Sequence, residues 1–500
     1  TAGSKNMSSL PQDLYTAQQT RELEHIVSEK HSISFSELMA QAGNAALKTL
    51  KQHWPTANHI LILCGPGNNG GDGYELARQA KHDGYQVTVL QIGDNKGLSL
   101  TATKAREKLL ATGTDIQSFQ TPLPAADIIV DALLGIGLNR SIDGNMRSVV
   151  ESVNASQAPV LSLDIPSGLH ADNGNVMSTA INAAATINFI GLNIGLFTGH
   201  GPDHTGHVYF DSLNVPSIVY ETKTPTVQRL SLEKNNPILT PRQRTSHKGL
   251  FGHLLVIGGD DGMSGAPGIA AEAGARVGSG LVSIATKTTH AIQLNIVRPE
   301  LMCHGIETPT GLAPLLQAAT AITLGPGLGQ QNWGESLYHK TIKTNHPMVV
   351  DADALNLLSQ NPQHNDHWIL TPHPGEAARL LNCSNADIQA NRLNAVQELQ
   401  RIYGGIIVLK GAGTLISNGT MPIQLSTLGN PGMSSGGMGD VLAGVIGGLL
   451  AQGAPLMEAA CTGVILHSMA GDKAAEQDGE RGMLAMDLMP HLRHLSNLIY

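Results

Sequence analysis

Short apolar segments alternate with helix-like segments along most of the 500-residue chain, and this alternation constrains the fold more than any other feature. A clear example is HILILCG at residues 59–65, which is followed by YELARQAKHDG and then by YQVTVLQIG. The apolar segments have the length of buried strands, and the segment between them is typical of a helix that stops at Gly84. Strands separated by helices form parallel sheets covered on both faces, so we predict a doubly wound α/β fold.

The alternation is interrupted once, and this interruption predicts a domain boundary. Between Glu221 and His247 the chain is polar, contains three prolines and has no sustained period. A second series of strands and helices follows, and the chain ends in helices from Asp440 onward. Because 500 residues exceed one ordinary core, we predict two domains, residues 1–234 and 235–500. Two helices are expected before the first strand, with Ser36 capping the second.

The composition excludes several classes of function. The net charge is −9 without a long basic run, so nucleic acid is not an expected partner. The four cysteines lie far apart without a CxxC pair, which argues against a zinc site and fits a reducing cytoplasm. Because the first residues are polar up to Arg21 and beyond, no secretory leader is expected, and the uncharged stretch 441–457 is broken by glycines and Pro455. We therefore expect a cytoplasmic enzyme with no membrane partner.

The turn CGPGNNGGDG, at residues 64–73, contains a GxGxxG pattern at Gly65, Gly67 and Gly70. Such a pattern is typical of a tight strand-to-helix turn or of a cradle for a dinucleotide pyrophosphate. Neither interpretation needs the two asparagines and the aspartate, Asp72, that this turn also carries.

Polar residues follow two later strands of the same predicted sheet. Asp131 ends one strand in VDALLGIGLNRS, and Asp164 and Ser167 end the next in DIPSGL. The carboxyl ends of parallel strands meet in one crevice, so these side chains are expected near the glycine-rich turn. Amide, carboxylate and hydroxyl oxygens are hard ligands, which favour an alkali or alkaline-earth ion over zinc.

The segments NNGGDG, VDALLGIGLNR and DIPSGL together resemble the NAD(P)H-hydrate epimerase domain, over about residues 10–220. The resemblance implies a Rossmann-like fold that binds a hydrated nicotinamide dinucleotide as substrate, with K⁺ held by Asn69, Asp131 and Ser167. The residues that it implies in dinucleotide contact are Asn68, Asn69, Gly70, Gly71, Asp72, Gly135, Ile136, Gly137, Leu138, Asn139, Arg140, Ser141 and Asp164. We interpret Asp164 as the acid or base that inverts C6 of the ring, with a purely structural role in the SGL turn as the alternative.

A second glycine-rich loop, NPGMSSGGMGD, ends at Gly436, Gly437, Gly439 and Asp440 and opens a helix. Backbone N–H groups at such a helix start form a concavity suited to phosphate, and the neighbouring carboxylate could accept a hydroxyl proton. The alternative is that Asp440 merely caps the helix. The sequence GxxxxGK[ST] does not occur, so this is not a P-loop enzyme.

Together with GMSGAP, GPGLG, VVDADAL, TPHPGE and KGAGT, this loop resembles the NAD(P)H-hydrate dehydratase domain, a ribokinase-like fold, across about residues 235–500. The resemblance implies that Ala266, Gly327, His373 and Asp440 face the hydrated dinucleotide. It implies an ADP or ATP co-substrate, with Mg²⁺ bridging its phosphates, bound by Lys410, Gly411, Ala412, Gly413, Thr414 and Gly439. Taken alone, His373 would more often be structural and Lys410 a surface lysine.

Both resemblances imply one task, the repair of hydrated NADH and NADPH. One half would interconvert the R and S hydrates, and the other would dehydrate the S form. Phosphoryl transfer to the C6 hydroxyl, with Asp440 as base, would create a leaving group that the ring nitrogen can expel. We also expect a homo-oligomer. The alternatives are a small-molecule kinase of the ribokinase-like class fused to a dinucleotide-binding module, and a non-enzymatic scaffold.

Overall fold

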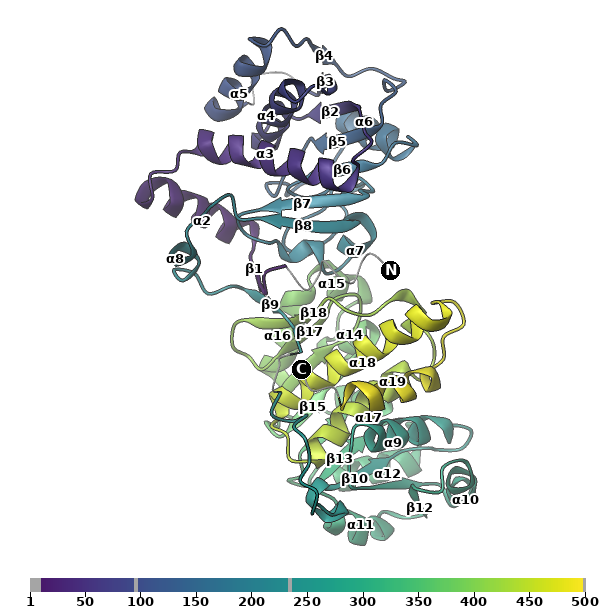
Figure 1. Ribbon diagram of the computed structural model, residues 1–500. Coiled ribbons are helices and arrows are strands. Elements are labelled where there is room, and N and C mark those ends of the chain that lie inside the picture. Colours follow the sequence, from purple (N-terminus) through teal and green to yellow (C-terminus); the bar gives the residue numbers. More distant parts are fainter. Residues whose placement is uncertain (1–9, 94–97, 233–235, 498–500) are drawn as a thin grey trace. The chain divides into compact units, whose positions relative to one another are not determined.

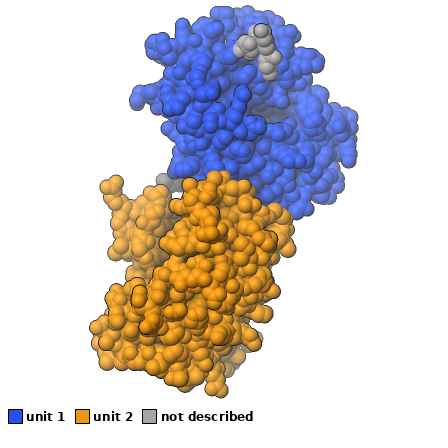
Figure 2. Space-filling view, turned by 180° about the vertical axis from the view of Figure 1, so that it is seen from behind, with its two compact units in different colours: residues 1–228 blue, residues 229–500 orange. Residues whose placement is uncertain are grey.

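The computed structural model describes residues 10–93, 98–232 and 236–497. The chain divides into two compact units, Thr1–Gln228 and Arg229–Tyr500, which Figure 2 shows in different colours. The predicted limit between residues 234 and 235 lies outside the described residues and stays a prediction. None of the helices in the described part of the chain combines the length and apolar character needed to cross a bilayer.

The described part of the first unit contains a seven-stranded sheet in the order β4-β3-β2-β5-β6-β7-β8 (Figure 1). Neighbouring strands of this sheet pair in parallel. The strands are β2 His59–Cys64, β3 Gln86–Gln91, β4 Ile116–Ser118, β5 Ile128–Ala132, β6 Val160–Leu163, β7 Ala185–Phe189 and β8 His207–Asp211. The chain order reverses between β2 and β5, so their carboxyl ends open a crevice.

Both faces of this sheet are covered, as predicted for a doubly wound fold. Ile60 and Ile62 of β2 join one core with α3, α4 and α5, whereas Leu61 and Leu63 join another with α6. This division follows from the alternation of side chains along a strand. The helices are α2 Ala17–Lys30, α3 Phe35–His53, α4 Asn68–His82, α5 Leu100–Leu110, α6 Gly144–Asn154, α7 Gly201–His204 and α8 Ser217–Tyr220.

The two helices expected before the first strand are confirmed as α2 and α3, but the predicted cap is wrong. Ser34, not Ser36, is the N-cap of α3, and its side chain forms a capping box with Glu37. The short strand β1 Asp13–Leu14 pairs antiparallel with β9 Val227–Arg229.

The sheet of the second unit has the order β18-β17-β16-β15-β14-β13-β10-β11-β12 over its described residues. The strands from β16 to β12 pair in parallel, and β16, β17 and β18 pair antiparallel. Their bounds are β10 His253–Ile257, β11 Leu281–Thr286, β12 Met302–Gly305, β13 Ala321–Leu324, β14 Met348–Val350, β15 Trp368–Leu370, β16 Ile406–Leu409, β17 Thr414–Ser417 and β18 Ile423–Ser426.

Helices α9, α17, α18 and α19 pack together over one face of this sheet and share its largest core (Figure 1). Helix α17 is rich in glycine because it passes very close to α9: a Cβ on Gly444 would lie 2.0 Å from the carbonyl oxygen of Ala270. The helices are α9 Gly265–Arg276, α10 Thr288–Val297, α11 Ala313–Ala318, α12 Asn332–Thr341, α13 Asp353–Gln360, α14 Pro374–Leu381, α15 Asn385–Ala390, α16 Arg392–Tyr403, α17 Met438–Ala451, α18 Leu456–Asp478 and α19 Leu488–Leu495.

Candidate active sites

The glycine-rich turn of the first unit is shorter than the sequence pattern suggested. Helix α4 begins at Asn68, so the asparagines and Asp72 belong to its first turns, not to a loop before Tyr74. Glycine is required because the turn packs against backbone: a Cβ on Gly65 would lie 1.8 Å from the carbonyl oxygen of Leu133. The polar groups of NNGGDG are therefore held by a helix that is packed on the sheet.

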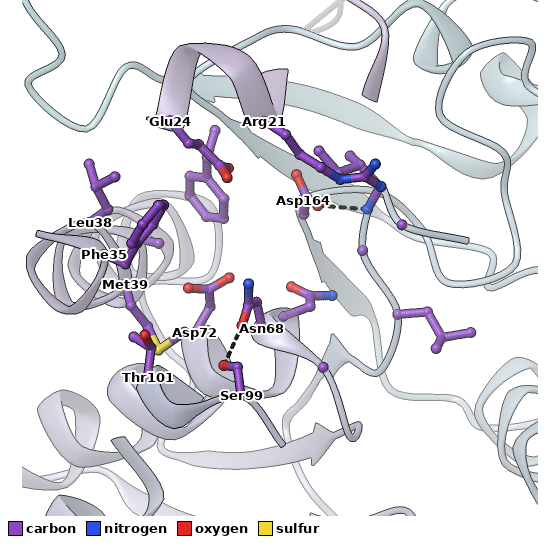
Figure 3. A pocket seen from close by; sticks show the side chains of 18 of the residues that line it. Arg21, Glu24, Phe35, Leu38, Met39, Asn68, Asp72, Ser99, Thr101 and Asp164 are labelled. Atoms are coloured by element: carbon purple, nitrogen blue, oxygen red, sulfur yellow. Dashed lines mark hydrogen bonds between the residues drawn. The ribbon is translucent and has the colours of Figure 1, made fainter. Parts of the chain in front are cut away.

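A cavity of about 750 Å³ opens where β2, β5 and β6 end (Figure 3). The predicted residues that line it are Asn68, Asn69, Asp72, Gly135, Ile136, Gly137, Leu138, Asn139, Arg140 and Asp164. Gly70 and Gly71 are buried below the turn, against Gly65 and Met39, and Ser141 is exposed at the end of its loop. The structure thus brings the three predicted segments to one cavity.

Another wall of this cavity comes from α2 and α3, to which the sequence patterns assigned no site residue. Arg21, Glu24 and His25 of α2 line it together with Phe35, Leu38 and Met39 of α3. These helices lack glycine-rich turns and strand ends, and only the spacing of Arg21 and Glu24, one helical turn apart, could have suggested a shared polar face.

Asp164 is held in place at the end of β6. Its backbone has a φ of 66°, which is uncommon for a residue with a side chain. Its carboxylate accepts hydrogen bonds from the Ile136 N–H at 2.9 Å and from the Asn188 amide at 3.3 Å. Burial raises the pKa of Asp164 to about 6, although the Ile136 N–H and the charge of Arg21 oppose this rise.

Two further carboxyl groups face the same cavity. Burial, followed by the charge of Asp164, raises the pKa of Glu24 to about 7, while Arg21 acts in the opposite direction. Burial and the charges of Asp164 and Glu24 hold the pKa of Asp72 well above its usual range. The cavity therefore raises the pKa of all three carboxyl groups above their usual range.

Of the three predicted ion ligands, Asn69 lines the cavity, whereas Asp131 and Ser167 are fully buried and are not among the lining residues. Asp131 is buried and accepts hydrogen bonds from the Ser167 hydroxyl at 2.6 Å, the Ser167 N–H at 2.9 Å and the Ser162 hydroxyl at 2.8 Å. The Asn69 amide donates to the Leu163 carbonyl at 3.2 Å. Its oxygen Oδ1 is buried and has no hydrogen-bond partner among the described residues. A buried acceptor without a partner is costly, so it marks a place where a ligand fits.

In the second unit, the glycine-rich loop leads directly into α17. Gly437 is the N-cap residue, with a φ of 90° that favours glycine, and no side chain caps this helix. Asp440 lies in the first turn of α17, so the alternative that Asp440 is the cap is wrong.

A buried cation lies next to this helix start. Nζ of Lys410 is 2.9 Å from Oδ1 of Asp351 and 3.9 Å from Oε2 of Glu376. A Cβ on Gly439 would lie 3.2 Å from the same Nζ atom. Lys410 is thus no surface lysine, and both carboxylates are site residues that the sequence patterns VVDADAL and TPHPGE contained without identifying.

These charges act on Asp440. Burial and the charge of Asp351 raise the pKa of Asp440 to about 7, whereas Lys410 lowers it. Burial alone would lower the pKa of Lys410, but the charges of Asp351 and Glu376 outweigh it and the pKa is raised. His373 is the N-cap of α14, where its ring accepts the Gly375 N–H at 2.9 Å. Burial lowers the pKa of His373, and so does the charge of Lys410.

The other predicted residues of this unit fall into two places. A Cβ on Gly327 would lie 3.3 Å from Cβ of Ala266, beside a pocket of about 900 Å³. The pocket is lined by Asp260, Asp261, Met263, Lys287, Gly329, Gln330, Gln331, Asn332, Trp333 and Asp353. The charge of Asp353, which lines this pocket, is one of those that raise the pKa of Asp440. Gly411 and Ala412 are exposed in the turn between β16 and β17, which Lys410 and Thr414 flank.

The fold and the two sites define a two-unit α/β enzyme, with one site at the strand ends of a doubly wound sheet and another at a glycine-rich helix start. Residues 36–195 match the family described as YjeF-related protein N-terminus, and residues 254–493 match NAD(P)H-hydrate dehydratase. The bifunctional NAD(P)H-hydrate repair enzyme of Coxiella burnetii is 46% identical, over 97% of this chain and 99% of its own. That of Escherichia coli is 44% identical, over 99% and 96%.

Among solved structures, a ribokinase-like superfamily protein of Enterococcus faecalis is 31% identical, with a TM-score of 0.50, over 54% of this chain and 95% of its own. The fold of the second unit is therefore ribokinase-like, as predicted. The chain belongs to the family of bifunctional NAD(P)H-hydrate repair enzymes. It combines an NAD(P)H-hydrate epimerase with an NAD(P)H-hydrate dehydratase, and the kinase and scaffold alternatives are set aside.

Proposed function

We propose that the two sites perform the two repair reactions with the residues predicted from the sequence. The hydrated dinucleotide binds in the cavity of the first unit, and Asp164 moves a proton at C6 of its ring. In the second unit the S hydrate faces Ala266, Gly327 and His373, and Asp440 acts as base. One observation carries the epimerase proposal. The Ile136 N–H holds Asp164 at the wall of a cavity that is large enough for a nicotinamide nucleotide.

The variant Asp164→Ala tests this proposal. Asp143→Ala is the matched control, because Asp143 is exposed and follows the loop of residues 135–141. Consumption of the R hydrate is followed by chromatography while dehydratase is in excess. With Asp164→Ala, the R hydrate should be consumed only as fast as it epimerises spontaneously. Dehydration of the S hydrate by this variant should continue. An unchanged rate of R consumption would leave Asp164 with a structural role only.

Potassium fits the cluster of Asn69, Asp131 and Ser167. The set offers one carboxylate and two neutral oxygens, and the unpartnered Oδ1 of Asn69 is an acceptor that a cation would satisfy. When bound, K⁺ would supply a positive charge beside Asn69, which lines the cavity proposed to take the anionic dinucleotide. Thermal stability should rise more in potassium chloride than in choline chloride of equal ionic strength, and Asn69→Ala should abolish the difference.

The dehydratase mechanism that we propose depends on the start of α17. Asp440 accepts the proton of the C6 hydroxyl while the hydroxyl oxygen attacks the terminal phosphorus of ADP or ATP, and the P–O bond to the departing AMP or ADP breaks. Backbone N–H groups of Gly436, Gly437 and Gly439 stabilise the charge that develops on the transferred group. The ring nitrogen lone pair then expels phosphate from C6, and loss of a proton from the neighbouring carbon restores the reduced ring.

The adenine nucleotide is proposed to lie on Lys410, Gly411, Ala412, Gly413, Thr414 and Gly439. The placement of Nζ of Lys410 against Gly439 supports this, because a cation beside the helix start favours phosphate. For Mg²⁺, the described residues contain no group of three or more His, Cys, Asp or Glu side chains that could hold a metal ion. Any Mg²⁺ would arrive with the nucleotide phosphates, and no step is derived through it.

We further propose a homo-oligomer in the cytoplasm. Ile292, Ile296 and Val297 of α10 are each more than 70% exposed, and such apolar side chains are typical of subunit interfaces. The cysteines, including exposed Cys383, are free, which agrees with a reducing compartment. Light scattering of Ile292→Glu/Ile296→Glu should report a smaller mass than the parent protein if this helix joins subunits.

A further inference from the structure

Glu24 faces the epimerase cavity from a different element than Asp164. Asp164 ends β6, whereas Glu24 lies on α2, and Figure 3 shows both carboxyl groups pointing into the same space. The charge of Asp164 is the largest electrostatic influence on Glu24 after burial. The two carboxyl groups therefore lie within interaction range of each other across a space that a substrate ring can enter.

The surroundings of Glu24 give it no structural task. Among the described residues, it makes no hydrogen bond or ion pair, although the apolar side chains of Phe35, Leu38 and Met39 share its wall of the cavity. Glu22, on the same helix, instead accepts a hydrogen bond from Gln18 at 3.0 Å and pairs with Lys223. A carboxyl group kept in a cavity without a partner costs stability, which suggests that it serves a ligand.

We propose that Glu24 is a second catalytic acid–base residue of the epimerase, paired with Asp164 across the hydrated ring. The proposal rests on the proposed role of Asp164. Inversion at C6 moves the hydroxyl from one face of the ring to the other. One carboxyl group reaches one face only, so two groups on different walls supply what a single Asp164 lacks.

In the proposed reaction, one carboxyl group gives a proton and the other takes one. The protonated carboxyl group gives its proton to the C6 hydroxyl, the C6–O bond breaks, and water leaves with the electron pair. The lone pair of N1 forms an N1=C6 double bond. A water molecule then adds to C6 from the opposite face and loses a proton to the ionised carboxylate, while the π electrons return to N1. The reverse reaction uses the same two groups in exchanged roles.

The raised pKa of Glu24, about 7, supports this exchange because both of its protonation states are accessible near neutral pH. Asp72 also faces the cavity, but its pKa is held well above its usual range, which suits a neutral hydrogen-bond donor to the substrate. Glu24 is therefore the better partner for Asp164.

The test compares Glu24→Gln and Glu24→Asp with the matched control Glu22→Gln in the full chain. Glu24→Gln should lower kcat for R-to-S conversion by about 10²–10⁴-fold, Glu24→Asp should recover part of it, and Glu22→Gln should have no effect. Dehydration of the S hydrate by the same preparations should be unchanged, which shows that the second unit is folded, and an unchanged thermal melting profile of the full chain should show that the first unit is folded too. In ¹⁸O-labelled water, each inversion by the parent enzyme should incorporate one solvent oxygen (heavy oxygen) at C6.

Three results would overturn the proposal. A higher KM with an unchanged kcat in Glu24→Gln would make Glu24 a binding residue only. Inversion without heavy oxygen at C6 would exclude cleavage of the C6–O bond. Full R-to-S activity in Glu24→Gln would remove Glu24 from the reaction, and if Asp164→Ala were inactive in the same assay, the proposed role of Asp164 would stand alone.

Discussion

Nζ of Lys410 lies 2.9 Å from Oδ1 of Asp351, and the two residues follow β16 and β14 in the sheet of the second unit. This buried ion pair faces the start of α17, where Gly439 and Asp440 lie. Removing one partner of a buried pair leaves a charge without compensation, which is strongly destabilising. The pair therefore connects the stability of the site with the protonation of Asp440.

Replacing Lys410 by methionine should change the pH dependence of the dehydratase. Because the charge of Lys410 lowers the pKa of Asp440, its removal should raise this pKa, and the acid limb of the kcat profile should move to higher pH. The activity near pH 7 should fall at least tenfold. The control is Lys473→Met, since Lys473 pairs with Glu476 on the surface. A profile that keeps its midpoint would mean that Lys410 does not act on Asp440.

Asp440→Asn should lower the rate of dehydration by about 10²–10⁴-fold, because the change keeps the shape of the side chain but removes the base. Epimerisation should be unaffected. In the parent enzyme the base must be ionised, so with a pKa of about 7 dehydration should fall about tenfold for each pH unit below that value. Steady-state rates with the S hydrate provide the measurement, and Asp478→Asn, an exposed site, is the control. Near-normal dehydration by Asp440→Asn would remove Asp440 from the mechanism.

How far the sequence predicts these sites depends on where each residue lies. Asp131 and Asp164 come directly after apolar strands, and strand ends in a parallel sheet converge on one crevice, so their proximity was predictable. Glu24 was not predictable, because an acidic residue on an amphipathic helix is normally solvated. Only the packing of α2 beside the cavity, which depends on contacts far apart in the sequence, gives Glu24 its position.

In the second unit, too, some features of the site were predictable from the sequence and others were not. The start of α17 after the glycine-rich loop was predictable from the consecutive glycines before Asp440, since the local backbone creates it. Lys410 looked like a surface lysine because its partners are far from it in the sequence: Asp351 follows β14, and Glu376 lies in the first turn of α14. The helix start of α4 was misplaced for a different reason: NNGGDG has poor helix propensity, and the close packing of its glycines outweighs that propensity.

His467 of α18 should make the second unit sensitive to acid. Its Nε2 lies 3.0 Å from the Met438 carbonyl, and burial lowers its pKa from 6.5 to about 4. Between these values the unfolded chain binds more protons than the folded chain, so stability is lost as pH falls from 6.5 towards 4, by up to about 3 kcal/mol. His467→Gln, which does not titrate, should lose less stability over this range.

The fluorescence of Trp333 and Trp368 can follow this loss in a Trp54→Phe background, because the chain has 3 tryptophans and Trp54 belongs to the first unit. Denaturant midpoints are compared at several pH values. The control is His367→Gln, as His367 is exposed. Equal pH dependence in His467→Gln and the parent protein would show that His467 does not cause the loss.

Finally, the second unit should dehydrate the S hydrate by itself. Its largest core contains residues from Leu230 onward, and the two cores of the first unit end at Tyr220, so each unit buries its own apolar side chains. The proposed dehydratase residues, from Ala266 to Asp440, also lie within the second unit. A fragment of residues 229–500 should therefore fold and dehydrate the S hydrate within about threefold of the full chain. It should use the R hydrate only at the rate of spontaneous epimerisation, which chromatography of the remaining R form measures. A soluble but inactive fragment, alongside an active full chain, would show that the dehydratase site needs the first unit.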